Sequence, residues 1–368
     1  MHPIAGTALT IGGAMHDTIV VLENNTVERI SLSNAHLSYL LLEEGQKAEA
    51  DLMAQSAGGG AVNTAIALAR LGFKTSTLIK VGTDDKAAQI RTALAREGVS
   101  LQYVRETDRL GTGSSVLILA HDRNAAIFTY RGANGLLDFR DIAPAGLAND
   151  LVYISGLSNE SATNFPAIVR AAHSAGAYIA ANPGARQLSA RADEFWSEIA
   201  KLSVLCVNRH EASLLIPHMK APSEDYRPIE TTSDTAPPWL LKYGLQFQSI
   251  HRGLIEWMRR ILAMGVRTVV VTDGARGAYA ATGAELTFCP ALAAKVQGTT
   301  GAGDAFSSTF AAYAATGHEV GVCLQRATTN ASAVVTVADA HSALLTHTTL
   351  EQVALDRSFE LKLSRWPI

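Results

Sequence analysis

The chain has 368 residues, of which 48% are hydrophobic and 18% charged, and its net charge of −3 offers no basic footprint for nucleic acid. Its three cysteines, Cys206, Cys289 and Cys323, are scattered and odd in number, which argues against a disulfide framework and indicates a reducing compartment. The N-terminus lacks the pattern of a signal peptide and no apolar run is long enough to span a bilayer, so we expect a cytoplasmic protein that binds neither membrane nor nucleic acid.

Short β-rich runs alternate with helical patterns along the chain. Each β-rich run ends in a turn signal, and a helical stretch follows it. This alternation predicts an α/β fold of three layers, with a mainly parallel sheet and helices on both of its faces. In such folds ligands bind at the carboxyl ends of the strands. We expect strands at 7–13, 75–82, 151–156, 177–184, 203–208 and 268–274, and helices at 61–72, 85–98 and 252–265.

Three regions break this rhythm. Residues 17–50 and about 110–133 alternate apolar and polar side chains, which is typical of strands with one solvated face. We expect both regions to form one small sheet that projects from the main domain. Prolines among polar residues at about 217–250 indicate an insertion loop.

The passage "QGTTGAGDAFSSTFAAYAATG" (297–317) places a lone carboxylate, Asp304, where a glycine-rich turn becomes an apolar helix. A capping role would explain an aspartate there. However, a cap does not need Gly-Ala-Gly before it, and glycines let the backbone approach a ligand. The amides of Gly301, Ala302 and Gly303 could hold a transferring phosphoryl group at the helix start, while Asp304 accepts a proton.

Other glycine-rich segments do not suggest a different nucleotide site. The sequence has no G-x-x-x-x-G-K-[ST] loop, and "GGGAVN" (58–63) follows no clear strand and is not G-x-G-x-x-G. The glycines after the first strand also lack the full dinucleotide fingerprint, so a nucleotide-dependent oxidoreductase is a weak alternative. Zinc-ligand spacing and a G-x-S-x-G elbow are absent from the sequence.

Two of these segments together resemble the ribokinase-like (PfkB) carbohydrate kinase family. "AGGGAVNTAIALARLG" (57–72) is similar to its N-terminal signature and "TTGAGDAFSSTFAAYAATG" (299–317) to its C-terminal one, with "NPGAR" (182–186), "VNRHEA" (207–212) and "TDGARG" (272–277) in the family's order between them. The resemblance implies one ribokinase-like kinase domain over 1–368 whose small β-sheet is a lid. It also implies ATP-dependent phosphorylation of a hydroxymethyl group on a sugar or nucleoside.

The resemblance assigns roles on the acceptor side of the site. Asp304 matches the catalytic base, and the amides of residues 301–303 match the anion hole. Asp17 matches an acidic residue that holds sugar hydroxyls, although a turn or edge-strand aspartate is an open alternative. A helix-start residue is the alternative for Asn63, and a solvated strand end for Arg131. The implied substrate-binding residues are Asp17, Gly58, Gly59, Asn63 and Arg131.

A second group of residues matches the nucleotide side of the family's site. Glu211 is expected near Mg²⁺, through water, because magnesium keeps several waters and takes few protein ligands. Asn208 and Glu211 could instead be a helix cap with a first-turn glutamate, and Asn330 an ordinary buried asparagine. The implied ATP-binding residues are Asn182, Asn208, Glu211, Thr272, Asp273, Gly274, Gly277 and Asn330.

The sequence also departs from the family at several positions. Gly298 stands where many relatives have an aspartate that helps to bind a monovalent cation, and 337–346 differs from the segment that completes that site, so the resemblance does not extend to potassium activation. Gly60 replaces a lysine of ribokinases, and the strand end at 155–161 offers no glutamate at the place where ribokinases hold ribose. The acceptor is therefore left open among a sugar, a sugar phosphate and a nucleoside.

Further expectations concern ligands and partners. Lys80 and Arg105 are candidates to bind a substrate phosphate, and Phe128 or Tyr39 could stack on a nucleoside base. Lid sheets expose an edge and an apolar face, which predicts a homodimer through the lid. A catalytically inactive regulatory protein of the same fold, which binds nucleotide or sugar, is the alternative to a kinase.

Overall fold

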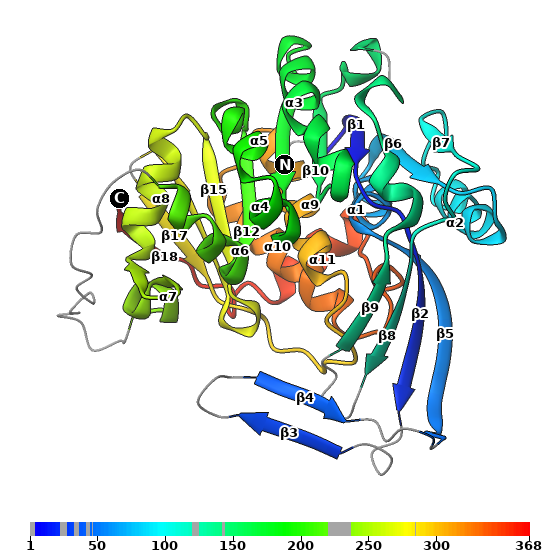
Figure 1. Ribbon diagram of the computed structural model, residues 1–368. Helices are drawn as coiled ribbons and strands as arrows, with labels where there is room; N and C mark the ends of the chain where they lie inside the picture. The colour runs from blue at the N-terminus through cyan, green and yellow to red at the C-terminus, as the bar shows by residue number, and fades with distance from the viewer. Residues whose placement is uncertain are drawn as a thin grey trace.

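A ten-stranded sheet forms the centre of the molecule (Figure 1). The computed structural model describes residues 4–22, 28–32, 37–41, 45, 47–119, 125–141, 144–219, 237–283 and 285–368. The strands of the central sheet are β1 (Gly6–Ile11), β6 (Phe73–Val81), β7 (Val104–Glu106), β10 (Leu151–Ser155), β11 (Tyr178–Asn182), β12 (Val204–Asn208), β15 (Thr268–Thr272), β16 (Ala278–Thr282), β17 (Glu285–Cys289) and β18 (Ser364–Pro367). Their order is β18-β17-β16-β15-β12-β11-β10-β1-β6-β7, and the strands from β15 to β7 are parallel.

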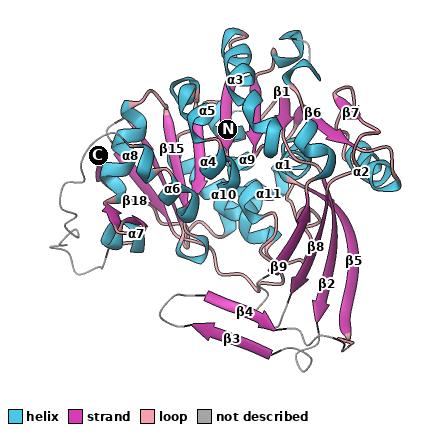
Figure 2. Cartoon of the chain, viewed as in Figure 1, coloured by secondary structure: helices cyan, strands magenta, loops and turns pink. Residues whose placement is uncertain are grey.

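Helices cover both faces of this sheet, as the alternating sequence pattern predicts (Figure 2). Successive residues of a parallel strand pack on opposite faces, which is why Val269 and Val271 join one hydrophobic cluster and Val270 another. The first face carries α3 (Phe165–Ser174), α4 (Ala185–Ala190), α5 (Ala192–Ser197), α6 (Arg209–Leu214), α7 (Trp239–Tyr243) and α8 (Leu254–Ala263). The second face carries α1 (Gly60–Arg70), α2 (Asp85–Arg96), α9 (Ala302–Ala315), α10 (Val320–Val334) and α11 (His347–Asp356).

No α-helix directly follows β15 (Thr268–Thr272), contrary to the expectation that a helical stretch follows each strand. After β15 a short 3₁₀ turn, η7 (Gly274–Arg276), leads into the antiparallel strands β16 and β17. Gly277 has a φ of 105°, a left-handed conformation that reverses the chain direction there. The remaining short elements are η1 (Gly132–Leu136), η2 (Phe139–Asp141), η3 (Pro144–Leu147), η4 (Asn159–Asn164), η5 (Ile199–Lys201), η6 (Ile216–His218) and the hairpin β13 (Leu245–Phe247) and β14 (Ile250–Arg252).

A separate four-stranded sheet projects from one end of the central sheet (Figure 1). We call it the lid sheet; it consists of β2 (Met15–Leu22), β5 (Ala50–Gly58), β8 (Ser114–Leu119) and β9 (Ala125–Tyr130), in the order β5-β2-β8-β9. The predicted small sheet is therefore present, built from the two distant segments. The hairpin β3 (Glu28–Leu32) and β4 (Leu37–Leu41) forms a sheet of its own at the far end.

The lid sheet extends further along the chain than the sequence pattern indicated. β5 runs to Gly58, beyond the expected limit at residue 50, so the expectation that "GGGAVN" follows no strand is wrong. The residues of β5 are mostly exposed and carry few large apolar side chains, which hides the strand from a pattern search. Residues 220–236 of the expected insertion at 217–250 lie outside the described residues. Within the described ranges, none of the helices combines the length and apolarity that crossing a membrane requires.

Candidate active site

The carboxyl ends of the parallel strands form one edge of the central sheet. The strand order changes direction at β1, which pairs with β6 on one side and β10 on the other. In open α/β sheets the crevice that binds ligands lies at such a reversal. Ser155, the last residue of β10, is buried there, and its hydroxyl donates to the carbonyl of Ile11 at 3.2 Å.

Asp304 lies in the first turn of α9, at this edge. Its Oδ2 accepts a hydrogen bond from Nδ2 of Asn63 at 2.7 Å, and Asn63 is itself buried in the first turn of α1. Burial raises the pKa of the Asp304 carboxyl; the bond from Asn63 opposes this, and the charge of Asp17 raises it further. The two helix starts thus place a half-buried carboxylate that holds its proton more readily than a surface aspartate does.

Asp17 enters the same region from the lid sheet. It lies on β2, opposite Ser56 of β5 and Ser115 of β8, and the Ser115 hydroxyl donates to its Oδ1 at 2.5 Å. Burial raises its pKa, while the bond from Ser115 acts against this. A Cβ placed on Gly58 would lie 2.0 Å from Asp17 Oδ2, so only glycine lets the carboxylate lie against the end of β5.

Gly60 lies where the start of α1, the end of β10 and the start of α9 meet. A Cβ there would lie 2.7 Å from Ser155 Cβ and 3.6 Å from Asp304 Oδ1. The start of α1, the end of β10 and the start of α9 are therefore in contact. Gly59, the residue before α1, has a φ of 92° and links β5 directly to this helix. The structure thus brings Asp17, Gly58, Gly59, Asn63 and Asp304 together.

The start of α9 presents free backbone amides. Gly301 has a φ of 80° and precedes the helix, and Ala305 is the first residue whose amide donates into it, to the carbonyl of Gly301 at 2.8 Å. Gly303 is exposed, and the amide of Ala302 makes a long bond of 3.4 Å to the carbonyl of Thr299. Unpaired amides and the positive end of the helix dipole make this turn suitable for an anion.

Polar residues of the next strands continue this edge. Asn208 ends β12 and caps α6: its Oδ1 accepts from the amide of Glu211, and Glu211 Oε2 accepts from the amide of Asn208, both at 2.9 Å. Burial raises the pKa of Glu211 to about 7, and the charge of Asp304 adds to the shift. Thr272 pairs with Asn208 in register, and Asn182 donates to the carbonyl of Cys206 at 2.8 Å.

Comparison with known proteins identifies the family of the chain. Residues 24–347 match the sequence profile described as "pfkB family carbohydrate kinase". The chain belongs to the pfkB family of carbohydrate kinases. The match includes the starts of α1 and α9, whereas Asp17 precedes it.

Individual pfkB relatives are distant in sequence. The chain is 26% identical to ribokinase of Bacillus subtilis (strain 168) over 305 residues, which cover 80% of this chain and 87% of the relative. It is 31% identical to an ATP-dependent ribose-1-phosphate kinase of Halopiger xanaduensis over 163 residues, 44% of this chain and 53% of that protein. The structure of Arabidopsis thaliana ribokinase complexed with ribose and ATP superposes with a TM-score of 0.68 at 21% identity, and covers 95% of this chain and 99% of that one.

One residue that the pfkB resemblance assigned to ATP lies away from solvent. Asn330 is completely buried in α10, where its Nδ2 donates to Thr309 Oγ1 at 2.8 Å and its Oδ1 accepts from the amide of Leu345 at 3.0 Å. Both ends of the amide bond within the protein, and the side chain has no exposed surface. The alternative, a buried hydrogen-bonded asparagine, describes it.

The candidates for acceptor recognition are also located differently from expectation. Lys80 pairs with Asp141 at 3.0 Å, and Arg105 donates to the carbonyls of Asp141 and Gln102, so neither is free for a phosphate. Phe128 pairs with Val116, next to Ser115 on β8, and therefore faces away from Asp17. The side chain of Tyr39 lies outside the described residues.

The nucleotide side includes a cluster that the motifs did not indicate. Asp273 is buried and pairs with Arg276 at 2.9 Å and Arg209 at 3.3 Å. Both guanidinium groups lie over the ring of Trp239, at 4.3 Å for Arg276 and 5.0 Å for Arg209. Trp239 belongs to α7, which lies within the expected insertion. The quoted motifs contain Asp273, Arg209 and Arg276, but a motif search could not find Trp239, because it carries no family signature.

The residues fit a magnesium ion held mainly by a nucleotide. Within the described ranges no group of three His, Cys, Asp or Glu side chains is placed to hold a metal. Glu211 is a single carboxylate whose Oε2 is bonded to the amide of Asn208, so it suits contact through water.

Gly298 lies where many pfkB relatives have the aspartate that helps to bind a monovalent cation. The residue provides no carboxylate, and a Cβ there would lie 3.1 Å from the carbonyl oxygen of Val337 and 3.2 Å from that of Ala338. The carbonyl of Val335 accepts from the amide of Gln297 at 2.8 Å. A side chain at this position would therefore require a small shift of the backbone at residues 337–338.

Proposed function

We propose that the protein is an ATP-dependent kinase that phosphorylates a hydroxymethyl group of a sugar or nucleoside. One observation carries this proposal: Asp304 is held by Asn63 at the amide-rich start of α9, beside the start of α1 and the end of β10. Phosphoryl transfer depends on positioning and charge stabilisation, and this arrangement provides both.

In the proposed reaction Asp304 removes the proton of the primary hydroxyl. The hydroxyl oxygen forms a bond to the γ-phosphorus as the bond from that phosphorus to the ADP oxygen breaks, and the proton remains on Asp304. The amides of Gly301, Ala302 and Gly303 stabilise the charge on the transferring group. Asn63 orients the carboxylate through the 2.7 Å bond to its Oδ2. Mg²⁺, held mainly by the nucleotide and through water by Glu211, would neutralise phosphate charge.

Acceptor binding is assigned to the lid side. Asp17 can accept hydrogen bonds from two adjacent hydroxyls, and Gly58 and Gly59 leave space for them. Asn63 Oδ1 is buried and has no partner among the described residues, which suits a substrate hydroxyl as its donor. Arg131, at the end of β9, completes this side.

Nucleotide binding is assigned to the ends of β11, β12 and β15. Asp273 would act by holding Arg209 and Arg276 in place, rather than by direct contact with the anionic nucleotide. The residues proposed to surround ATP are Asn182, Asn208, Glu211, Thr272, Gly274 and Gly277.

A screen for acceptor-dependent ADP formation tests the proposal. The protein is incubated with Mg²⁺-ATP and a panel of sugars, sugar phosphates and nucleosides. We expect stoichiometric ADP and phosphorylated acceptor with at least one class. ATP binding without turnover across the panel would instead support an inactive regulatory protein of the same fold.

We also propose a cytoplasmic homodimer that forms through the lid sheet. Met53, Val116 and Phe128 are 68%, 40% and 62% exposed, and apolar side chains so exposed favour pairing with a second copy. The buried thiols of the three cysteines suit a reducing compartment. A monomeric mass in solution at micromolar concentration would contradict the dimer.

A further inference from the structure

A segment that follows α10 contacts both the lid sheet and the start of α9. It consists of residues 337–344, which form turns and bends, and we call it the 337–344 segment. One carboxylate holds its central turn: Asp339 Oδ1 accepts from the amide of His341 at 3.0 Å and from the amide of Ser342 at 2.7 Å. Bonds from an aspartate to the amides of the next residues fix the local backbone. Ala340 and His341 therefore keep a constant position relative to each other.

On one side the 337–344 segment packs against the glycine-rich turn before α9. A Cβ on Gly301 would lie 2.5 Å from the Cβ of Ala340 and 2.7 Å from its carbonyl oxygen. Ala340 is buried, so it is enclosed at this contact. The position of Ala340 therefore limits where the backbone of Gly301 can lie, and with it the amides that are proposed to hold the phosphoryl group.

On the other side the segment is bonded to the end of β5 in the lid sheet. Nε2 of His341 lies 2.9 Å from the carbonyl oxygen of Ala57 and 3.1 Å from Oγ of Ser56. A carbonyl oxygen can only accept, so Nε2 carries a proton and donates it to Ala57 in this bond. Ser56 lies opposite Asp17 in the pairing of β5 with β2, and Ala338 packs against the apolar cluster of the lid sheet. His341 thus bonds the segment to the strand beside the carboxylate that is proposed to hold the acceptor.

The 337–344 segment is also fixed to α1. Arg70, the last residue of this helix, donates from Nη1 to the carbonyls of His341 at 2.9 Å and Leu344 at 2.7 Å. The same guanidinium pairs with both carboxylate oxygens of Glu97, at 2.7 and 2.8 Å. A two-point pair of this kind fixes the geometry of an arginine. The bond from His341 to β5 is therefore made from a rigid support and not from a free loop.

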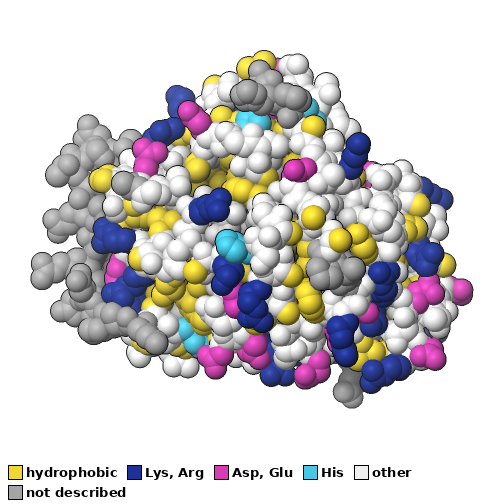
Figure 3. Space-filling view, turned by 90° about the horizontal axis from the view of Figure 1, so that it is seen from above, with side chains coloured by type: hydrophobic (Ala, Val, Ile, Leu, Met, Phe, Trp, Pro, Cys, Tyr) yellow, Lys and Arg dark blue, Asp and Glu magenta, His cyan; other side chains and the backbone are white. Residues whose placement is uncertain are grey.

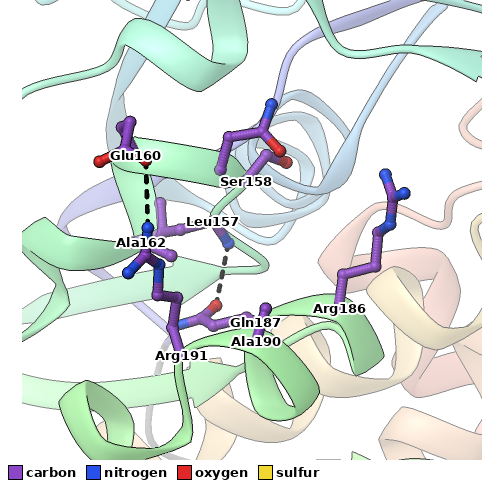
Figure 4. A pocket seen from close by; sticks show the side chains of 9 residues that line it. Leu157, Ser158, Glu160, Ala162, Arg186, Gln187, Ala190 and Arg191 are labelled. Carbon is purple, nitrogen blue, oxygen red and sulfur yellow. Dashed lines mark hydrogen bonds and ion pairs between the residues drawn. The ribbon is translucent and has the colours of Figure 1, made fainter.

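Other polar contacts near the strand ends have a local role. Among the described residues on the face in Figure 3, Lys and Arg are interspersed among Asp and Glu, as on an ordinary solvated surface. Figure 4 shows Gln187 bonded to the backbone of Leu157 and Arg191 paired with Glu160, and these bonds join the regions of α4 and η4 to each other. The bond from His341 differs from them, because it joins the central domain to the lid sheet.

We infer that His341 is a positioning residue that couples the lid sheet to the start of α9, so that an acceptor held at Asp17 is aligned with the phosphoryl group held at residues 301–303. The inference rests on the proposed function. A displacement of the end of β5 acts on His341, and the fixed turn passes it through Ala340 to Gly301. Phosphoryl transfer depends on alignment, and a misplacement of about 1 Å can cost about 10²-fold in rate.

Three variants of the whole chain test the coupling. His341→Leu removes the ring donor, whereas His341→Gln keeps an amide donor that can still bond the carbonyl of Ala57. Gln89→Leu is the matched control: Oε1 of Gln89, on α2, is bonded to Nε2 of His16 on the lid sheet at 2.9 Å. This change also removes a hydrogen bond between the lid sheet and the central domain, but the bond does not involve the 337–344 segment.

In His341→Leu we expect kcat to fall by about 10-fold or more and the acceptor KM to rise by about 3-fold or more, because alignment and lid position are both lost. The Kd for Mg²⁺-ATP without acceptor should stay nearly constant, since the amides of residues 301–303 remain. His341→Gln should recover most of both losses, and Gln89→Leu should keep the wild-type kcat. A role confined to stability would lower the melting temperature and leave these constants unchanged. Unchanged constants in His341→Leu, equal losses in both His341 variants, or an equal loss in Gln89→Leu overturns the coupling while the kinase stands.

Amide hydrogen exchange of the free protein separates this inference from the proposed function, because it needs no turnover. His341→Leu should speed exchange by about 3-fold or more, the equivalent of one hydrogen bond, both in β5 and at the start of α9, where the amide of Ala305 donates to Gly301. Gln89→Leu should leave the start of α9 unchanged. If no acceptor is phosphorylated but both segments respond to His341→Leu, the coupling stands and the kinase proposal fails. Unchanged exchange at the start of α9 in His341→Leu refutes the coupling, whatever the turnover.

Discussion

Asp304→Asn removes the proposed base while it keeps the shape of the site. The asparagine oxygen can still accept the bond from Asn63, whose Nδ2 lies 2.7 Å from Oδ2 in the wild type. A positioned general base contributes about 10²–10⁴-fold, so we expect kcat to fall by about 10³-fold, or about 4 kcal/mol in the activation barrier. The affinity for Mg²⁺-ATP should change little, because the amides of residues 301–303 remain.

The assay is ADP release with the best acceptor, combined with calorimetric titration of Mg²⁺-ATP. Asp150→Asn is the matched control: its carboxylate accepts from the amide and hydroxyl of Thr7 at 2.7 and 2.9 Å, at the opposite edge of the sheet. This control should keep the wild-type rate. A rate for Asp304→Asn within about 10-fold of the wild type would refute Asp304 as the base.

The same change should stabilise the free protein. Burial and the charge of Asp17 raise the pKa of Asp304, so the folded state holds this proton to a higher pH than the unfolded state, whose ordinary value is 3.8. The contribution of Asp304 to the free energy of unfolding is therefore greatest below that value and declines as the pH rises to the folded pKa. Asp304→Asn should lack this decline and gain about 0.5–2 kcal/mol at neutral pH. Urea unfolding at pH 4 and pH 7.5 measures the difference; a loss of stability at pH 7.5 would contradict it.

Other changes test the acceptor side, the cation site and the correction at Asn330. Gly58→Ala places a Cβ 2.0 Å from Asp17 Oδ2 and should therefore displace that carboxylate. We expect kcat/KM for the acceptor to fall by about 10-fold or more, while the KM for ATP stays nearly constant. An unchanged kcat/KM for the acceptor would contradict this contact. Exchange of potassium for choline at constant ionic strength should leave the rate unchanged, because Gly298 provides no carboxylate for the cation. Strong activation by potassium would contradict this. Asn330→Leu should lower the free energy of unfolding by about 2–4 kcal/mol, because it leaves the Thr309 hydroxyl and the amide of Leu345 without their partner. A large change in the KM for ATP would instead indicate that Asn330 contacts the nucleotide.

Much of the fold could be predicted because its strands are buried on both faces. Continuous apolar runs such as "TVVV" (268–271) end in turn residues, and those ends coincide with the carboxyl edge of the sheet. β5 could not be predicted in this way, because most of its residues are exposed and pairing with β2 alone defines it. The helix expected after β15 was wrong because a local turn at Gly277 determines the direction of the chain.

The positions of the site residues could be predicted where a glycine-rich motif fixes the backbone. They could be predicted less well where the role of a residue depends only on the contacts of its side chain. The glycine-rich turn before Asp304 and the start of α1 at Asn63 carry their geometry in the sequence. Asn330 could not be placed in this way, because the sequence pattern of an asparagine on a helix is the same whether its amide faces a ligand or the protein interior.

The direct passage from β5 into α1 restricts how this protein can be altered. Gly59 is the single residue between the strand and the helix. Removal of one residue from β5 would reverse the alternation of its side chains and turn Ser56 away from Asp17. Insertion of one residue would rotate Asn63 away from Asp304. Circular permutation or domain fusion at this junction should therefore inactivate the protein. The opposite end of the lid, beside the β3–β4 hairpin, is the better place for an engineered graft.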